Sequence, residues 1–104
     1  MRAGTLRALM AKAKHAREVR SFTDIPNVGE AMAGDFRALG FARPQELAGQ
    51  DALALYRRLC ALTNTRQDPC VLDTFLAVVD FMDGGAPRPW WDFTAERKKR
   101  HPDL

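Results

Sequence analysis

The segment from residue 70 to 82 constrains the fold most, because as a helix it is apolar around nearly its whole circumference. Apolar residues recur on it at helical spacing and also beside that face, namely at Val71, Leu72, Phe75, Leu76, Val78, Val79 and Phe81. Such a helix is normally buried, so the rest of the chain must surround it. Asp68 and Pro69 suit its N-cap and first turn, and Gly84 and Gly85 end it.

The remaining segments also predict helices. A basic amphipathic helix is expected over residues 5–20, a second over 30–39, a short one over 44–47, a longer one over 51–62, and a last basic turn that begins at Thr94. No segment alternates with a period of two. We therefore expect an all-α domain of about five helices, divided into a basic arm over 1–20, a helix-hairpin-helix domain over 21–94 and a basic C-terminal tail over 95–104.

A tight hairpin is predicted between the first two helices, at Ile25-Pro26-Asn27-Val28-Gly29. Pro26 cannot continue a helix, while Asn27 and Gly29 tolerate a positive φ. The sequence therefore predicts a helix, a hairpin and a helix, and this pattern returns in looser form with the turn at 48–50.

The charges of the 104-residue chain are unevenly divided, although the formal net charge is only +3. Residues 1–20 carry a net charge of +5, residues 21–96 one of −5, and residues 97–104 one of +3. A nucleic-acid partner would therefore have to be attracted by the two ends and not by the acidic body. The acids Asp73, Asp80 and Asp83 are interpreted as a solvated edge of the core helix.

Three blocks of the chain resemble the small bacterial family of pathogenicity-locus (Cdd) and mitomycin-resistance-like proteins. They are residues 25–33, residues 66–73 with the sequence Arg-Gln-Asp-Pro-Cys-Val-Leu-Asp, and Pro89-Trp90-Trp91. The hairpin half is also similar to the C-terminal domain of competence-regulator proteins. The resemblance implies a DNA-linked helix-hairpin-helix fold.

Helix-hairpin-helix modules hold a phosphate with backbone N–H groups at the start of the second helix, aided by its dipole. The matching groups here are the amides of Asn27, Val28, Gly29, Glu30 and Ala31. Glu30 stands where DNA-binding members often have a basic residue, so its carboxylate opposes a phosphate. Supporting cations are expected from both ends, at Arg17, Arg20, Arg97, Lys98, Lys99 and Arg100.

The two cysteines, Cys60 and Cys70, allow two interpretations. They can be small buried hydrophobic residues at a contact between helices. Alternatively, Cys70 in the first turn of its helix has a lowered pKa and is a redox-active thiol with Cys60 as its partner. Their spacing, with His15 and His101 far away in the sequence, matches no usual metal site.

The leading hypothesis is a cytoplasmic, non-catalytic accessory protein that contacts DNA phosphates without sequence specificity. The alternatives are a protein–protein interaction module with a purely structural hairpin and a thiol-redox protein acting through Cys70. We find no catalytic motif, and we expect no cofactor, metal or membrane partner. The aromatic cluster from Pro89 to Phe93 is interpreted as a lid on the core, with stacking on exposed bases as the alternative.

Overall fold

The computed structural model describes residues 12–104, and all regular structure in that range is helical. The elements, with η for a 3-10 helix, are η1 (Ala16–Glu18), η2 (Phe22–Asp24), α2 (Glu30–Ala38), η3 (Pro44–Leu47), α3 (Ala52–Thr63), α4 (Pro69–Met82), η4 (Trp90–Phe93) and α5 (Thr94–Arg100). The prediction of an all-α fold is confirmed, with four α-helices in the described residues against about five expected for the chain. None of these helices is long and apolar enough to cross a membrane.

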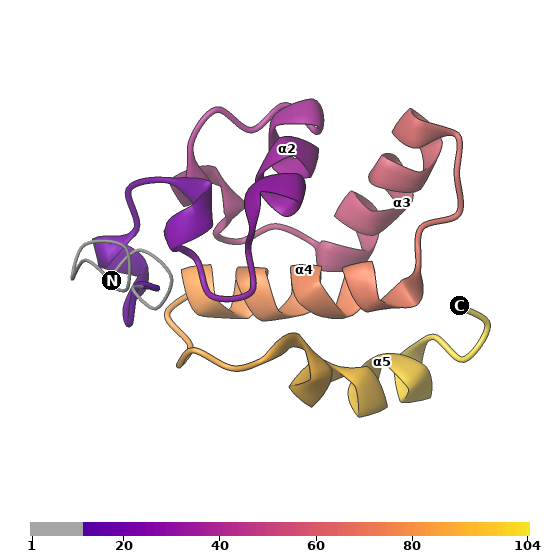
Figure 1. Ribbon diagram of the computed structural model, residues 1–104. Helices are drawn as coiled ribbons and strands as arrows, with labels where there is room; N and C mark the ends of the chain where they lie inside the picture. Colours follow the sequence, from indigo (N-terminus) through magenta and orange to yellow (C-terminus); the bar gives the residue numbers. More distant parts are fainter. Residues whose placement is uncertain (1–11) are drawn as a thin grey trace, which may run out of the picture.

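Helix α4 runs through the middle of the molecule (Figure 1). Helices α2 and α3 lie on one side of it, and η4 and α5 lie on the other. Eight of its fourteen residues are buried, namely Leu72, Asp73, Thr74, Phe75, Ala77, Val78, Phe81 and Met82. The predicted core helix is therefore confirmed, and both layers of the fold pack against it.

An aromatic cluster joins η2 and α2, the two elements that flank the first hairpin, to α4. The ring of Phe36 on α2 lies 5.3 Å from that of Phe75 on α4 and 5.6 Å from that of Phe22 on η2. All three side chains are buried. Because burying a phenylalanine contributes roughly 1.5–3 kcal/mol, this cluster fixes the position of α2 on α4.

A unit made of a 3-10 turn, a hairpin and an α-helix occurs twice in the chain. Each element of the second copy begins 22 residues after its counterpart. The 3-10 turns η2 and η3 begin at residues 22 and 44, and the helices α2 and α3 begin at residues 30 and 52. In each 3-10 turn a carboxylate accepts hydrogen bonds from two backbone N–H groups just before it. Asp24 accepts at 2.9 and 3.0 Å, and Glu46 at 2.6 and 2.8 Å. These bonds lower the pKa of both carboxyl groups. The predicted second helix pair is confirmed.

The structure departs from the expected helices before the first hairpin. The basic helix expected over residues 5–20 lies partly outside the described residues, and residues 12–20 contain only η1 within an otherwise extended path. The element that enters the hairpin is likewise the 3-10 turn η2. The prediction of an α-helix there is wrong, because Asp24 caps a single turn from within and Pro26 follows directly.

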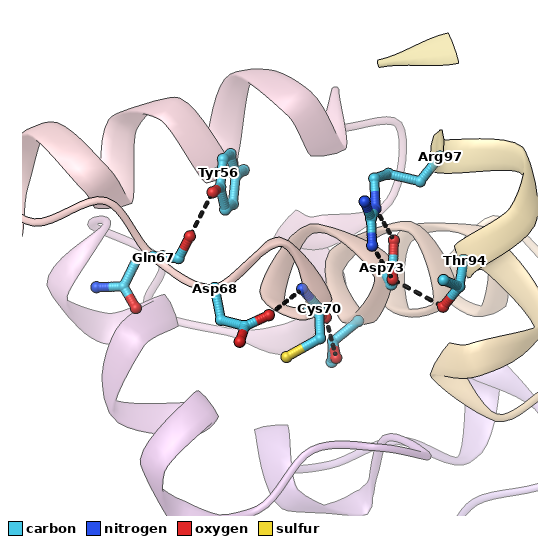
Figure 2. Close-up of polar contacts among 8 residues, drawn as sticks. Tyr56, Gln67, Asp68, Cys70, Asp73, Thr94 and Arg97 are labelled. Carbon is cyan, nitrogen blue, oxygen red and sulfur yellow. Dashed lines mark hydrogen bonds and ion pairs between the residues drawn. The ribbon is translucent and has the colours of Figure 1, made fainter. Parts of the chain in front are cut away.

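A buried ion pair connects α4 to α5 (Figure 2). The Asp73 carboxylate accepts from Arg97 Nε at 2.9 Å, from Arg97 Nη2 at 3.2 Å and from Thr94 Oγ1 at 2.8 Å. Asp73 is fully buried and Arg97 is 7% exposed. The bonds to Asp73 raise the pKa of the Arg97 guanidinium.

This pair corrects two sequence interpretations. Asp73 is not part of a solvated edge, and Arg97 is not a free cation of the tail. The segment expected as a basic tail begins within α5, which packs on α4. The physical reason is that Asp73 lies among apolar neighbours, where an unpaired charge is strongly disfavoured.

Removing one partner of this pair is expected to destabilise the fold severely. Asp73→Ala leaves the Arg97 guanidinium buried without a carboxylate, and it should lower the free energy of unfolding by about 3–5 kcal/mol in urea titrations. The double variant Asp73→Ala/Arg97→Met, which removes both charges, should recover most of that loss.

Asp92→Ala is the matched control, because it removes the carboxylate of the exposed Arg88–Asp92 pair. Exposed pairs contribute about 0–1 kcal/mol, so the control should be nearly neutral. An Asp73→Ala effect as small as that of Asp92→Ala would contradict a structural role for the buried pair.

Candidate functional site

The first hairpin, residues 25–29, is held by two buried anchors and one left-handed residue. Ile25 and Val28 are 0% and 1% exposed, and the Val28 N–H donates to the Ile25 carbonyl at 3.1 Å. Asn27 between them has a φ of 75°, which confirms the expectation that it tolerates the left-handed region. The hairpin backbone is therefore fixed, and Gly29 and Glu30 are exposed directly after it.

Several backbone N–H groups at this hairpin have no acceptor within residues 12–104. They belong to Asn27, Gly29, Glu30 and Ala31, whereas the Val28 N–H is used inside the turn. Gly29 is the N-cap of α2 and offers no side chain to the helix. Within the described part of the chain, four of the five amides predicted to bind phosphate therefore lack an acceptor, and no side chain caps the positive end of the α2 dipole.

The second hairpin, residues 47–51, has the same backbone but carries its own anions. Gly49, the counterpart of Asn27, has a φ of 74°, and its N–H donates to the Asp83 carboxylate at 2.6 Å. Asp51, the counterpart of Gly29, accepts from the Ala54 N–H at 3.1 Å. Carboxylates therefore bond two N–H groups of the second hairpin, at Gly49 and Ala54, whose counterparts in the first, at Asn27 and Met32, have no acceptor within residues 12–104.

Lys12 supplies a cation at the back of the first hairpin. Its ammonium donates to the Thr23 and Val28 carbonyls, each at 2.6 Å. The Val28 carbonyl and the Gly29 N–H belong to one peptide unit and point in opposite directions. A cation on the carbonyl polarises that unit, so the Gly29 N–H becomes a stronger donor on the open side. Sequence analysis missed this role, for which the only signal was the position of Lys12 in the basic arm.

Five of the six predicted supporting cations are exposed, and they lie on two separate segments. Arg17 and Arg20 are exposed on the segment that leads into the first hairpin, and Lys98, Lys99 and Arg100 are exposed on α5. Figure 1 shows α5 running toward the end of the molecule away from the first hairpin. Arg97 leaves the set because it is buried against Asp73. The cations nearest the hairpin in the chain are therefore those of the N-terminal segment.

The Asn27 side chain ties the first hairpin to the aromatic segment after α4. Its Nδ2 donates to the Arg88 carbonyl at 2.8 Å, and its Oδ1 accepts from the Trp90 N–H at 3.1 Å. Asparagine can make both bonds because its amide carries a donor and an acceptor. Sequence reasoning explained Asn27 by its φ alone and missed this contact.

The aromatic segment is only partly a lid. Trp90 and Phe93 are half-buried, and η4 packs on α4, as a lid requires. Trp91 is 62% exposed and packs its ring edge-to-face on Trp90, with centroids 5.6 Å apart. The interpretation as a lid is therefore wrong for Trp91, which points away from the core.

Both cysteines are unpaired, half-buried thiols. Burial and the neighbouring Asp68 carboxylate raise the pKa of the Cys70 thiol, which contradicts the lowered pKa expected of a reactive group. Asp68 caps α4 by accepting from the Cys70 N–H at 2.9 Å, so its charge lies beside the thiol (Figure 2). Cys60 Sγ accepts from the Gln67 N–H at 3.4 Å, as part of the loop packing.

The loop between α3 and α4 is held against α3 by one hydrogen bond. Tyr56 donates to the Gln67 carbonyl at 2.5 Å (Figure 2).

A cleft of about 420 Å³ lies between the second hairpin, α4 and α5, and the side chains of Asp80, Glu96 and His101 are among those that line it. Among residues 12–104, no three His, Cys, Asp or Glu side chains are grouped to hold a metal ion.

Comparison with known proteins gives one family and one curated relative. The model of the Cdd1 family, described as "Pathogenicity locus", matches residues 15–99. The chain is also 40% identical over 77 residues to the mitomycin resistance protein McrB of Streptomyces lavendulae, covering 74% of this chain and 73% of the relative. No solved structure matches the chain. These matches confirm the family resemblance drawn from the three sequence blocks.

The thiol of Cys70 is expected to titrate at a higher pH than that of an unfolded cysteine. In a Cys60→Ser background, the rate of alkylation by iodoacetamide should rise with pH around a midpoint above that of the same chain in urea, because burial and Asp68 both disfavour the thiolate. Asp68→Asn removes the charge while an amide oxygen can still cap the helix, and it should lower the midpoint. A midpoint in the folded chain below that of the unfolded chain would contradict this account and support a reactive thiol.

Proposed function

We propose that this chain, which belongs to the Cdd1 pathogenicity-locus family, is a non-catalytic protein that binds the DNA backbone through its first hairpin. The observation that carries the proposal is the difference between the two hairpins. In the second, the Asp83 and Asp51 carboxylates accept from the Gly49 and Ala54 N–H groups, whereas the corresponding N–H groups of the first, those of Asn27 and Met32, have no acceptor in the described residues. A phosphate is the anion that fits such a position on DNA.

The binding would not depend on base sequence. Backbone N–H groups and a helix dipole recognise a phosphate oxygen, and phosphates carry no base information. Lys12 strengthens the Gly29 donor from behind and adds a positive charge to the site. The first hairpin therefore supplies one well-oriented phosphate contact.

Glu30 limits the affinity of that contact. It is exposed in the first turn of α2, where it stabilises its own helix through the dipole. A phosphate about 6 Å away would be repelled by about 0.7 kcal/mol at water-like screening, comparable to the ~0.3–1 kcal/mol that a helix N-terminus offers. Most of the affinity is then expected from the basic residues outside the hairpin, such as Arg17 and Arg20.

The alternative functions receive less support. The raised pKa of Cys70 speaks against a thiol-redox protein. A protein–protein interaction module would need the hairpin only as a structural turn, and that leaves the uncapped N-terminus of α2 without a role. An interaction module predicts that hairpin variants leave DNA binding unchanged, so one experiment on these variants separates it from the DNA-binding proposal.

The test compares the affinity of hairpin variants for a short fluorescent duplex at two salt concentrations. Gly29→Asp copies the closed second hairpin, because residue 29 corresponds to Asp51 and a Cβ there meets nothing within 4 Å. It should keep or slightly raise the free energy of unfolding while it weakens DNA binding by about 5- to 30-fold, through a filled N-cap and added repulsion. Binding by the parent chain should weaken with salt, with a slope of about −0.9 per phosphate neutralised.

Glu30→Lys and Glu96→Lys form a matched pair with the same change in net charge. Glu30→Lys should raise the affinity by about tenfold, whereas Glu96→Lys, beside the second hairpin, should raise it much less. Equal effects of the two lysines, together with no effect of Gly29→Asp, would show that DNA contact is only a matter of overall charge and would overturn the proposal.

A further inference from the structure

Trp91 is an exposed aromatic side chain on the segment that is hydrogen-bonded to the first hairpin. Its 62% exposure is unusual for the largest apolar side chain, which is normally mostly buried. The residue before it, Trp90, donates its N–H to Asn27 in the middle of the first hairpin. The Trp91 ring therefore belongs to the segment that is hydrogen-bonded to the hairpin. The proposed phosphate contact, which is made by backbone amides, does not involve this ring.

The backbone that carries Trp91 is fixed at both ends of η4. Asn27 binds the Arg88 carbonyl and the Trp90 N–H on one side, and Thr94 Oγ1 donates to the buried Asp73 on the other. The ring of Trp91 packs on Trp90 at an interplanar angle of 85°. A partner that stacks on it would immobilise little that is not already ordered, which favours binding.

The segment that carries this ring also carries a cation. The Arg88 guanidinium lies 4.4 Å from the centroid of Phe93 and is partly exposed, with Asp92 at 3.5 Å as its exposed partner. Leu62 on α3 is the other exposed large apolar side chain within residues 12–104, at 57%, but it is aliphatic and has no face on which a base can stack. An exposed aromatic face, on a segment that carries a cation and is bonded to the first hairpin, is a usual combination for binding single-stranded nucleic acid.

We infer that Trp91 stacks on an unpaired base, so that the protein prefers DNA in which a single-stranded stretch adjoins the phosphate held by the first hairpin. This inference rests on the proposed function and narrows its substrate class. Bases inside an intact duplex are stacked on each other and do not offer a free face to a side chain fixed on the protein surface. An unpaired base in an overhang or gap does, and the stacking is tolerant of sequence because every base has a π-face.

The test measures binding of the full chain to a blunt duplex and to the same duplex with a single-stranded overhang. The parent chain should bind the overhang DNA more tightly. Trp91→Ala should weaken that binding by about 5- to 100-fold and leave binding to the blunt duplex nearly unchanged, whereas Trp91→Phe should keep part of the preference. Leu62→Ala, which removes a similarly exposed apolar side chain, should change neither affinity. Thermal unfolding of each variant shows whether its fold is intact.

A second measurement reports on Trp91 directly. Trp90→Phe leaves Trp91 as the single tryptophan of the chain. Its fluorescence should be quenched by the overhang DNA and much less by the blunt duplex, since stacking on a base quenches an indole.

The outcomes separate this inference from the proposal on which it rests. Loss of binding to both DNAs in Gly29→Asp, with no selective loss in Trp91→Ala and no selective quenching, would overturn the stacking role and leave the hairpin contact standing. If Gly29→Asp changed the affinity for neither DNA, the hairpin contact itself would be overturned. Unchanged DNA binding in Trp91→Ala, together with loss of a protein partner, would assign the ring to that partner and also overturn the inference.

Discussion

The buried pair of Asp73 and Arg97 determines how the two layers of the molecule meet. It joins α4 to α5, and the same carboxylate holds Thr94 at the end of η4. Asn27 in the first hairpin is bonded in turn to this segment: its side chain donates to the Arg88 carbonyl and accepts from the N–H of Trp90, the first residue of η4. Polar contacts at both ends of η4, joined by its backbone, thus connect the core ion pair to the proposed DNA contact. A buried charge is costly unless it is fully paired, so this arrangement leaves little freedom to its members.

The repeated hairpin unit shows how two nearly identical backbones come to differ in chemistry. Both copies place a residue in the left-handed region, enter through a 3-10 turn and begin an α-helix at corresponding positions. The difference lies in single side chains: aspartates at 51 and 83 neutralise the second copy, while Gly29 leaves the first uncapped. The distribution of carboxylates thus distinguishes the two copies: an aspartate caps the helix of the second, and no side chain among residues 12–104 caps that of the first.

Much of the fold was predictable from the sequence, because it follows from local patterns. The apolar periodicity of residues 70–82 identified α4, and the turn residues placed both hairpins close to their observed positions. The 3-10 turn before the first hairpin was missed, since a carboxylate that caps its own turn leaves no periodic signal. The contacts of Asp73, Lys12 and Asn27 were also missed. They join residues 11 to 63 positions apart in the chain, and a single sequence contains no information on which distant partners the fold brings together.

We propose that the first hairpin, and not the charged ends alone, contacts DNA. This can be measured by titrating the ¹⁵N-labelled chain with a short DNA that has a single-stranded overhang and following the backbone amide resonances. The amides of Gly29, Glu30 and Ala31 are expected to shift on binding, while that of Gly49, already bonded to Asp83, is not. Shifts confined to the basic segments before the first hairpin and on α5, with the hairpin amides unmoved, would contradict this proposal.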